Sequence, residues 1–315
     1  PEFPEPPDQV DSAVWVKTCP IQSQGIKVGG SVHHRAPQCV MLTTSEIELY
    51  HEKGLIIPRD FRLPATEVEC LRSAVDSVAT NNPDTPTDFL FNVHLDQAPP
   101  LRLVGHSAFS TLVTDDKILD MVEQLIGPDI INWATHLFCK QATTGRAVPW
   151  HQDGQYWPIR PLRTCTVWVA IDRTTRANGA LRYIPGSHKA GIYSHRTDNS
   201  PDLTLHQVID DPRFDENEAL YAELEPGQIS LHDVHLLHGS AANQSGDRRA
   251  GFSIRYMPST SVLRRDLDMS QISKLDWTQI PLTLVRGKNR HAENDLEIGH
   301  RSGSVSGSSQ RRPQY

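Results

Sequence analysis

The chain has 315 residues, of which 37% are hydrophobic, and a formal net charge of -7 at pH 7. This length allows one large or two small globular domains, and the absence of any run of about 18 consecutive apolar residues argues against a membrane span. Lysine and arginine are scattered rather than clustered, so the charge pattern argues against a nucleic-acid partner.

Cysteine usage indicates the redox compartment. Five cysteines stand far apart and never form a Cys-x-x-Cys pair, namely Cys19, Cys39, Cys70, Cys139 and Cys165. An odd number of widely spaced cysteines favours reduced thiols over a disulfide framework or a zinc knot. We therefore expect a cytoplasmic protein.

The first part of the chain predicts an arm followed by helices. Residues 1–41 are rich in Pro, Gly, Ser and Gln without periodicity, so we expect an extended N-terminal arm. A helical lead-in over residues 42–130 follows. It begins with a capping box of Thr43 and Glu46, and Gly54 stands where the first helix should end. "LIIP" (55–58) then suggests a strand, and apolar residues at helical spacing predict helices around 68–78 and 118–126.

Strand-like alternation replaces helical spacing over residues 131–260, in "INWATHLF", "TCTVWVAI", "ALRYIP", "QISLH" and "AGFSIRYM". In "TCTVWVAI" an aliphatic face alternates with a mixed face that carries Thr166 and Trp168, so one side should pack and the other can line a cavity. We predict a mainly β protein with flanking helices, built as a barrel or jelly roll. A C-terminal segment over 261–297 should complete the domain, and residues 298–315 should be disordered.

A pattern of metal ligands stands in "WHQDGQYW" (150–157). On an extended strand His151 and Asp153 would point to the same side, where they could share a metal ion. A third ligand could come from His232, His235 or His238 in "SLHDVHLLHGS" (230–240). Two histidines and one carboxylate on one face of iron(II) are typical of non-heme oxygenases.

An arginine follows these histidines at the start of a predicted strand. Arg249 shares a strand face with Gly251, Ser253 and Arg255. Its guanidinium could hold a dicarboxylate through two charge-assisted hydrogen bonds.

Three motifs resemble, in order and spacing, those of the phytanoyl-CoA dioxygenase (PhyH) family of iron(II)- and 2-oxoglutarate-dependent oxygenases: "WHQDGQYWP" (150–158), "NGALRYIPGSHK" (178–189) and "HGSAANQSGDRR" (238–249). The resemblance covers residues 42–260 and implies a double-stranded β-helix, a cupin-like jelly roll, as the core of a dioxygenase domain over 42–297. It implies roles for seven residues. Iron(II) would be bound by His151, Asp153 and His238, and 2-oxoglutarate would be contacted by Arg249, Ser240, Trp168 and His136.

The resemblance also implies the reaction, which is hydroxylation of an unactivated C–H bond of a small-molecule metabolite by O2, with release of succinate and CO2. Ascorbate is expected to support activity in vitro. Asp153 occupies the position that halogenases of the superfamily leave to chloride, which favours hydroxylation. The substrate and the oligomeric state do not follow from the resemblance. Candidates for substrate contacts are Arg102, His106, Gln155, Trp157, Arg160 and Arg255.

Two other classes of protein are compatible with these residues. A zinc-dependent hydrolase could use His232 and His235 as ligands, with water at an open position. Alternatively, the barrel could bind a ligand without catalysis. In the oxygenase interpretation we expect His232 and His235 to be structural, because neither directly precedes the Gly-Ser and Arg pattern that follows His238.

Overall fold

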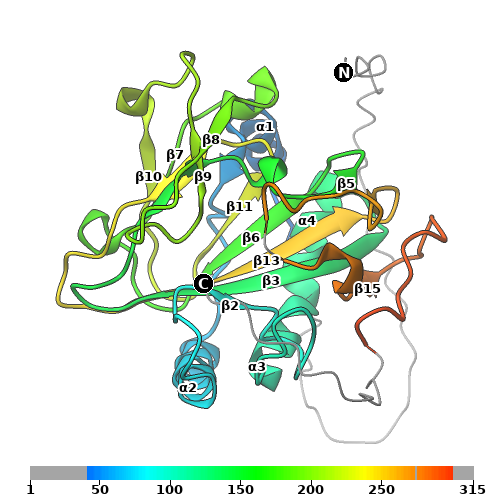
Figure 1. Ribbon diagram of the computed structural model, residues 1–315, viewed down its shortest axis with the longest axis horizontal. Helices are drawn as coiled ribbons and strands as arrows, with labels where there is room; N and C mark the ends of the chain where they lie inside the picture. The colour runs from blue at the N-terminus through cyan, green and yellow to red at the C-terminus, as the bar shows by residue number, and fades with distance from the viewer. Residues whose placement is uncertain (1–40, 274, 301–315) are drawn as a thin grey trace, which may run out of the picture. The chain divides into compact units, whose positions relative to one another are not determined.

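The computed structural model describes residues 41–273 and 275–300. This part of the chain forms four α-helices (Figure 1), namely α1 (Thr44–Lys53), α2 (Ala65–Asn81), α3 (Ser107–Val113) and α4 (Asp116–Ile126). Helix α1 begins with the reciprocal capping box of Thr43 and Glu46, and it ends at Gly54, whose φ of 80° lies in the left-handed region. The predicted boundaries of this helix are therefore confirmed.

The larger sheet has seven strands in the order β1-β11-β6-β13-β3-β15, with β2 also paired to β3. Figure 1 shows β6, β13 and β3 side by side along their length. The pairings are antiparallel, and β15 shows that the chain beyond residue 260 contributes to this sheet. The strands are β1 (Leu55–Ile56), β2 (Leu90–Phe91), β3 (Ile130–Lys140), β6 (Cys165–Ala170), β11 (Ile229–Asp233), β13 (Arg249–Pro258) and β15 (Thr283–Arg286).

The smaller sheet has four strands in the order β10-β7-β12-β4. They are β4 (Val148–His151), β7 (Leu181–Tyr183), β10 (Leu220–Ala222) and β12 (His238–Ser240). Along the chain, β3, β4, β6, β7, β11, β12 and β13 alternate between the two sheets. This winding is the double-stranded β-helix, so the predicted fold class is confirmed.

Short elements connect the two sheets. Two small ribbons pair β5 (Ile159–Arg160) with β14 (Val262–Leu263) and β8 (His195–Thr197) with β9 (Gln207–Ile209). The 3-10 turns are η1 (Asp153–Gln155), η2 (Arg176–Asn178), η3 (Ser187–Ala190), η4 (Glu216–Glu218) and η5 (Trp277–Gln279).

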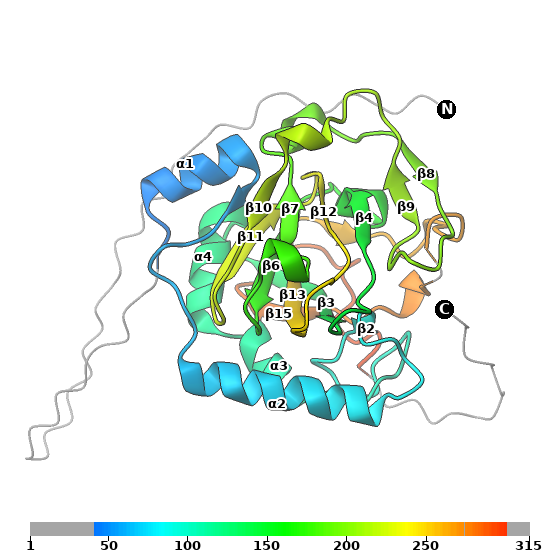
Figure 2. The ribbon, with the colours of Figure 1, turned by 90° about the vertical axis from the view of Figure 1, so that its left-hand side faces the viewer.

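The two faces of the larger sheet have different partners. On β6, Cys165, Val167 and Val169 join the main hydrophobic cluster, to which α2, α3 and α4 contribute their apolar faces. Figure 2 shows α1 and α2 outside the two sheets. The alternate residues Thr166 and Trp168 line a cavity between the sheets. Strand alternation thus places the apolar side chains against the helices and leaves the inner face for polar chemistry.

The predicted ends of the chain fall partly outside the described residues. The arm over 1–41 lies there except for Met41, as do residues 301–315 of the predicted tail. Residues 298–300 form a turn in which the His300 ring contacts the Leu282 carbonyl oxygen at 3.0 Å. Among the described helices, none is long and apolar enough to cross a membrane.

Candidate metal centre and cosubstrate site

A cavity between the two sheets collects most of the polar side chains singled out in the sequence. About 490 Å³ of space, part of it open to solvent, lies between the atoms that line it. Its walls come from the inner faces of β3, β4, β6, β7, β11, β12 and β13. The polar residues that line it are His151, Asp153, Thr166, His232, His238, Ser240, Arg249, Ser253 and Arg255, and Phe138, Val148, Trp168, Leu181 and Leu205 supply apolar walls.

Three side chains at one point of this cavity could hold a metal ion. His151 is the last residue of β4, Asp153 is the first residue of η1, and His238 is the first residue of β12. His151 and His238 are paired across the antiparallel strands β4 and β12. One ligand atom of each of the three residues lies within 4.8 Å of the other two, and the residues are only 2%, 5% and 7% exposed.

Hydrogen bonds orient both imidazoles toward a common point. The Nδ1 atom of His151 lies 2.8 Å from the Pro149 carbonyl oxygen, and Nδ1 of His238 lies 2.9 Å from that of Leu236. A carbonyl accepts only, so each Nδ1 must carry the proton, and each Nε2 then presents a lone pair to the cavity. Nε2 of His151 lies 3.6 Å from Oδ1 of Asp153. This is the ligand arrangement that a divalent cation requires.

Asp153 reaches this point by a different route from the one we expected. The sequence suggested that His151 and Asp153 share one strand, but β4 ends at His151 and Asp153 lies in a 3-10 turn. The side chain of Gln152 fixes this turn, because its amide donates to the carbonyls of Gly191 and His235 and accepts from the Tyr193 N–H. Tertiary hydrogen bonds therefore replace strand geometry in positioning the carboxylate.

The protonation states also suit a metal ion. Burial alone would raise the pKa of Asp153, but the neighbouring imidazoles of His151 and His232 outweigh burial and hold the pKa well below its usual value. Burial, together with the nearby His151, holds the pKa of His238 well below that of an ordinary histidine. An ionised carboxylate and a neutral imidazole are the forms that bind metal.

Arg249 supplies a buried positive charge at the start of β13. Its side chain is buried, with only 3% of the residue exposed. The Nη2 atom donates to the Gly179 carbonyl at 2.7 Å and lies 3.5 Å from the Ser240 hydroxyl. The Nε atom has no partner in the described structure. Burial lowers the pKa of this guanidinium to about 10, so it still carries its charge at neutral pH. Its free donors fit a carboxylate ligand.

The indole of Trp168 forms the wall beside this guanidinium, with the Arg249 Cζ atom 5.4 Å from the ring centroid. A Cβ atom on Gly251 would lie 1.9 Å from Trp168, so only glycine leaves room for the ring at this point of β13. The mixed face of β6 predicted from the sequence therefore contributes directly to the cavity.

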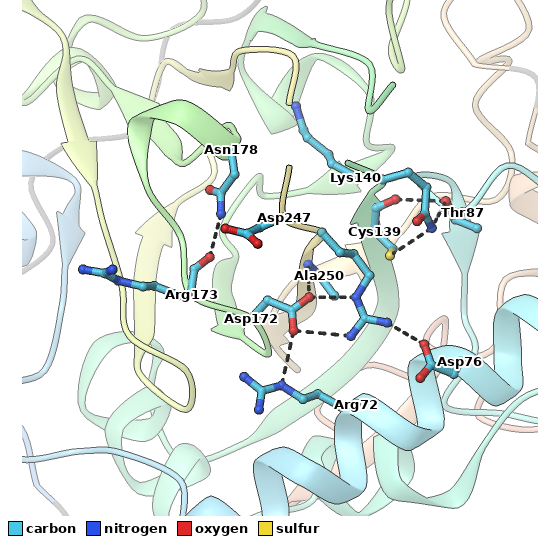
Figure 3. A network of polar contacts seen from close by, with 12 residues as sticks. Arg72, Asp76, Thr87, Cys139, Lys140, Asp172, Arg173, Asn178, Asp247 and Ala250 are labelled. Atoms are coloured by element: carbon cyan, nitrogen blue, oxygen red, sulfur yellow. Dashed lines mark hydrogen bonds and ion pairs between the residues drawn. The ribbon is translucent and has the colours of Figure 1, made fainter. Parts of the chain in front are cut away.

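An ionic network outside the cavity holds the backbone around Arg249. The Asp172 carboxylate accepts from the Ala250 N–H at 2.9 Å and from Nε of Arg248 at 2.9 Å, and Arg72 of α2 reaches the same carboxylate at 3.3 Å. Figure 3 shows Asp172 between Ala250 and Arg72, with Asp76 close by on the same helix as Arg72. Both chain neighbours of Arg249 are thus anchored, which restricts where its side chain can point.

Several predicted site residues lie away from the cavity lining. The ring of His136 stacks on Phe138 with a centroid distance of 3.8 Å, so Phe138 lines the cavity in its place. His106 caps helix α3 by accepting from the Ala108 N–H. Arg102 and Arg160 are exposed.

Two other substrate candidates lie in the segment after η1 begins. Trp157 is buried in a hydrophobic cluster with Trp133, and Gln155 belongs to η1 without lining the cavity. Of the six substrate candidates, only Arg255 lines the cavity.

The structure adds one histidine that the sequence analysis set aside. His232 lines the cavity, whereas His235 lies outside this lining and bonds to Asp233. The two therefore do not form the zinc pair considered above, and the only cluster of ligand atoms found in the described residues is that of His151, Asp153 and His238. The alternation in "QISLHD" could have indicated that His232 faces inward, but not which residues it meets there.

The fold and this site define the class of protein. A double-stranded β-helix with two histidines and one carboxylate, next to a buried arginine, is the arrangement of a non-heme iron(II)- and 2-oxoglutarate-dependent oxygenase. Enzymes of this class use iron(II), 2-oxoglutarate and O2, and the three-residue cluster fits such a metal ion. A family model for phytanoyl-CoA dioxygenase (PhyH) matches residues 50–251, and the chain belongs to this family.

Individual relatives differ in how much of them is matched. A probable alpha-ketoglutarate-dependent hypophosphite dioxygenase of Stutzerimonas stutzeri is 31% identical over 47% of this chain and 52% of its own length. A probable phytanoyl-CoA dioxygenase of Caenorhabditis elegans is 26% identical over 69% of this chain and 75% of its own length. The chain thus spans about half of the first relative. Among solved structures, the apo non-heme monooxygenase ThoJ matches with a TM-score of 0.60 at 26% identity, over 77% of this chain and 84% of that one.

Proposed function

We propose that the protein hydroxylates an unactivated C–H bond of a small-molecule metabolite. In the overall reaction, substrate, O2 and 2-oxoglutarate give an alcohol, succinate and CO2, with one oxygen atom entering the alcohol and the other entering succinate. One observation carries the proposal. A single cavity combines the ligand atoms of His151, Asp153 and His238 with the buried guanidinium of Arg249.

We assign the roles of these residues as follows. His151, Asp153 and His238 would hold iron(II), which supplies the redox chemistry when bound. Arg249 and the Ser240 hydroxyl would hold the distal carboxylate of 2-oxoglutarate. The chain itself would orient the two small molecules in the space between the sheets.

Other neighbours of these residues refine their roles. The Thr166 hydroxyl donates to Oδ2 of Asp153 at 3.4 Å, which restrains the carboxylate while Oδ1 faces His151. A carboxylate thus fills the ligand position that halogenases of the superfamily leave open, and this supports hydroxylation. The indole of Trp168 would cover the cosubstrate beside Arg249.

The proposal extends to the domain and its location. We assign residues 42–297 to one dioxygenase domain, with residues 1–41 as an arm and 298–315 as a tail. A cytoplasmic location fits the free thiols of Cys70, Cys139 and Cys165.

The experiment is a comparison of metals in the absence of any chosen substrate. The metal-free protein is loaded with iron(II) or zinc(II), supplied with 2-oxoglutarate, O2 and ascorbate, and assayed for succinate. We expect slow succinate release with iron and none with zinc. Oxidation of 2-oxoglutarate by O2 requires a redox-active metal, and zinc(II) is not redox-active. A panel of metabolites is then screened. The substrate is the metabolite that increases succinate release and gives a product heavier by one oxygen atom, about 16 mass units. Hydrolysis with zinc, or iron uptake without succinate, would support one of the two alternative classes.

A further inference from the structure

The larger sheet presents a second group of polar side chains at the level of the metal centre. His232 on β11 is paired with Thr166 on β6, and Thr166 is paired with Arg255 on β13. The three residues therefore form one row across three neighbouring strands, with their side chains on the inner face. All three line the cavity, opposite the strands that carry His151 and His238.

Arg255 is a buried cation without a direct ion pair among the described residues. It is 8% exposed, and the nearby Asp153 carboxylate, itself a candidate metal ligand, acts on its guanidinium only through space. Its Nε atom has no hydrogen-bond partner, and its side chain instead faces the rings of Trp157 and Trp133, whose centroids lie 5.2 Å and 5.9 Å from Cζ. A charge removed from water without a partner is unfavourable, so such a group points to a ligand of opposite charge.

His232 has unused hydrogen-bonding capacity in the same place. It is 2% exposed, and neither of its ring nitrogens has a hydrogen-bond partner in the described structure. Nε2 lies 3.7 Å from Oδ2 of Asp153, so the ring faces the metal centre without bonding to it. Buried polar groups are nearly always satisfied, which indicates that a bound molecule completes this site.

The second arginine is too far along the strand to serve the same carboxylate as the first. Arg249 and Arg255 stand six residues apart on β13, which separates their Cα atoms by about 20 Å along an extended strand. Arg249 is already directed by Gly179 and Ser240 toward one end of the cavity. The distal carboxylate that Arg249 would hold there is therefore not the partner of Arg255.

We propose that the substrate carries an anionic oxygen group, such as a carboxylate, phosphonate or sulfonate, which binds Arg255 with His232 beside it. This inference rests on the proposed function, because it assigns the group to the molecule that is hydroxylated. The anion would anchor the substrate on the larger sheet and direct a neighbouring C–H bond toward the metal centre.

The test uses methylphosphonate as a small anionic probe and its neutral dimethyl ester as the matched control. Binding to the full chain is measured by calorimetry, once with iron(II) and 2-oxoglutarate under anaerobic conditions and once without metal. The variants are Arg255→Gln, Arg255→Lys and Arg249→Gln. Arg163→Gln serves as the matched control, because Arg163 is an exposed arginine outside the cavity.

We expect methylphosphonate to bind the wild type and Arg163→Gln equally, and the ester to bind neither. Arg255→Gln should raise the methylphosphonate Kd about 10- to 150-fold, the range for loss of a charged hydrogen bond, and Arg255→Lys should raise it less. Arg249→Gln should instead act mainly on the 2-oxoglutarate Kd.

Four results would overturn the inference. These are no methylphosphonate binding to the wild type, equal binding of the ester, an unchanged Kd in a folded Arg255→Gln protein, and a rise in the 2-oxoglutarate Kd of Arg255→Gln as large as in Arg249→Gln. Thermal unfolding of each variant verifies that it is folded. Failure of the proposed function would look different, as wild-type protein that takes up no iron and releases no succinate, whereas the titration without metal would still report on Arg255.

Discussion

Arg249 and Arg255 stand on the same inner face of β13, but their surroundings differ. The Gly179 carbonyl and the Ser240 hydroxyl direct Arg249, and Asp172 anchors the residues on either side of it. The guanidinium of Arg255 lies beside the rings of Trp133 and Trp157, and its Nε atom has no hydrogen-bond partner among the described residues. The difference suggests that one end of the cavity is preformed for a constant molecule, 2-oxoglutarate, and that the other end is completed by the substrate.

Both arginines would serve the same metal centre, and its removal should have the largest effect. His238→Ala should reduce succinate release by more than about 100-fold, beyond the range for residues that only orient a ligand. His235→Ala is the matched control, because this ring lies outside the cavity lining. A folded His235→Ala protein without activity, beside an active His238→Ala protein, would show that the wrong histidine was assigned.

Loss of the preformed end should have the next largest effect. Arg249→Ala removes a charged hydrogen bond worth roughly 1.5 to 3 kcal/mol, so the 2-oxoglutarate half-saturation should rise about 10- to 150-fold while iron binding persists. The 2-oxoglutarate half-saturation of Arg249→Lys should lie between those of the wild type and Arg249→Ala, because an ammonium keeps the charge but cannot present two parallel donors. Steady-state kinetics decide this, and an unchanged half-saturation in Arg249→Ala would assign the carboxylate to another residue.

His232 belongs to the end that the substrate completes, although the sequence suggested a structural role. His232→Phe keeps the ring volume and removes both nitrogens, and we expect turnover with the identified substrate to fall about 10- to 100-fold, the range for residues next to a metal ligand. The fall should exceed that in His235→Ala. Equal activities of these two variants would show that His232 contributes to packing rather than to substrate binding.

Burial in the interior of the protein also lowers the pKa values of three histidines. Burial lowers the pKa of His94 to about 3, and it holds the pKa values of His136 and His238 well below the usual range. The unfolded chain takes up these protons near pH 6.5, whereas the folded chain resists them. The free energy of unfolding of the metal-free protein should therefore fall as the pH drops below about 6.5, by roughly 1.4 kcal/mol per pH unit for each such histidine.

Denaturant unfolding at a series of pH values measures this slope. In His94→Gln, whose new side chain cannot take up the proton, the slope should decrease by one histidine's contribution. A slope equal to that of the wild type would mean that His94 is protonated similarly in the folded and unfolded states.

The smallest effect should come from the Thr166 hydroxyl, which donates to Asp153. Thr166→Val removes a 3.4 Å hydrogen bond to Asp153 and leaves the side-chain shape almost unchanged. A neutral hydrogen bond contributes about 0.5 to 1.5 kcal/mol, so turnover should fall about 2- to 12-fold. A larger loss would indicate that Thr166 itself contacts a reacting molecule.

The sequence was informative where a pattern is local. The capping box at Thr43, the strand alternation around Trp168 and the short motif around His151 each depend on neighbours within a few positions. These patterns predicted a barrel or jelly roll and the pair of His151 and Asp153. The choice of His238 and most of the cosubstrate contacts came instead from the resemblance to the family.

The rest depends on which strands become neighbours. His232 and Arg255 meet at Thr166 through the register of three strands that are far apart in the chain, and no local pattern encodes this register. The position of Asp153 depends on hydrogen bonds from Gln152 to the carbonyls of Gly191 and His235, which lie 39 and 83 residues further along the chain. His106, predicted as a substrate contact, caps helix α3 and lies outside the cavity lining.

The most direct test of the central claim is an anaerobic titration of iron(II) into the metal-free protein and into Asp153→Ala. We predict one iron per chain in the wild type, and a loss of this binding in Asp153→Ala, which removes the only carboxylate of the three-residue cluster. Equal iron binding by the two proteins, with both folded, would contradict the assignment of the metal centre and the account built on it.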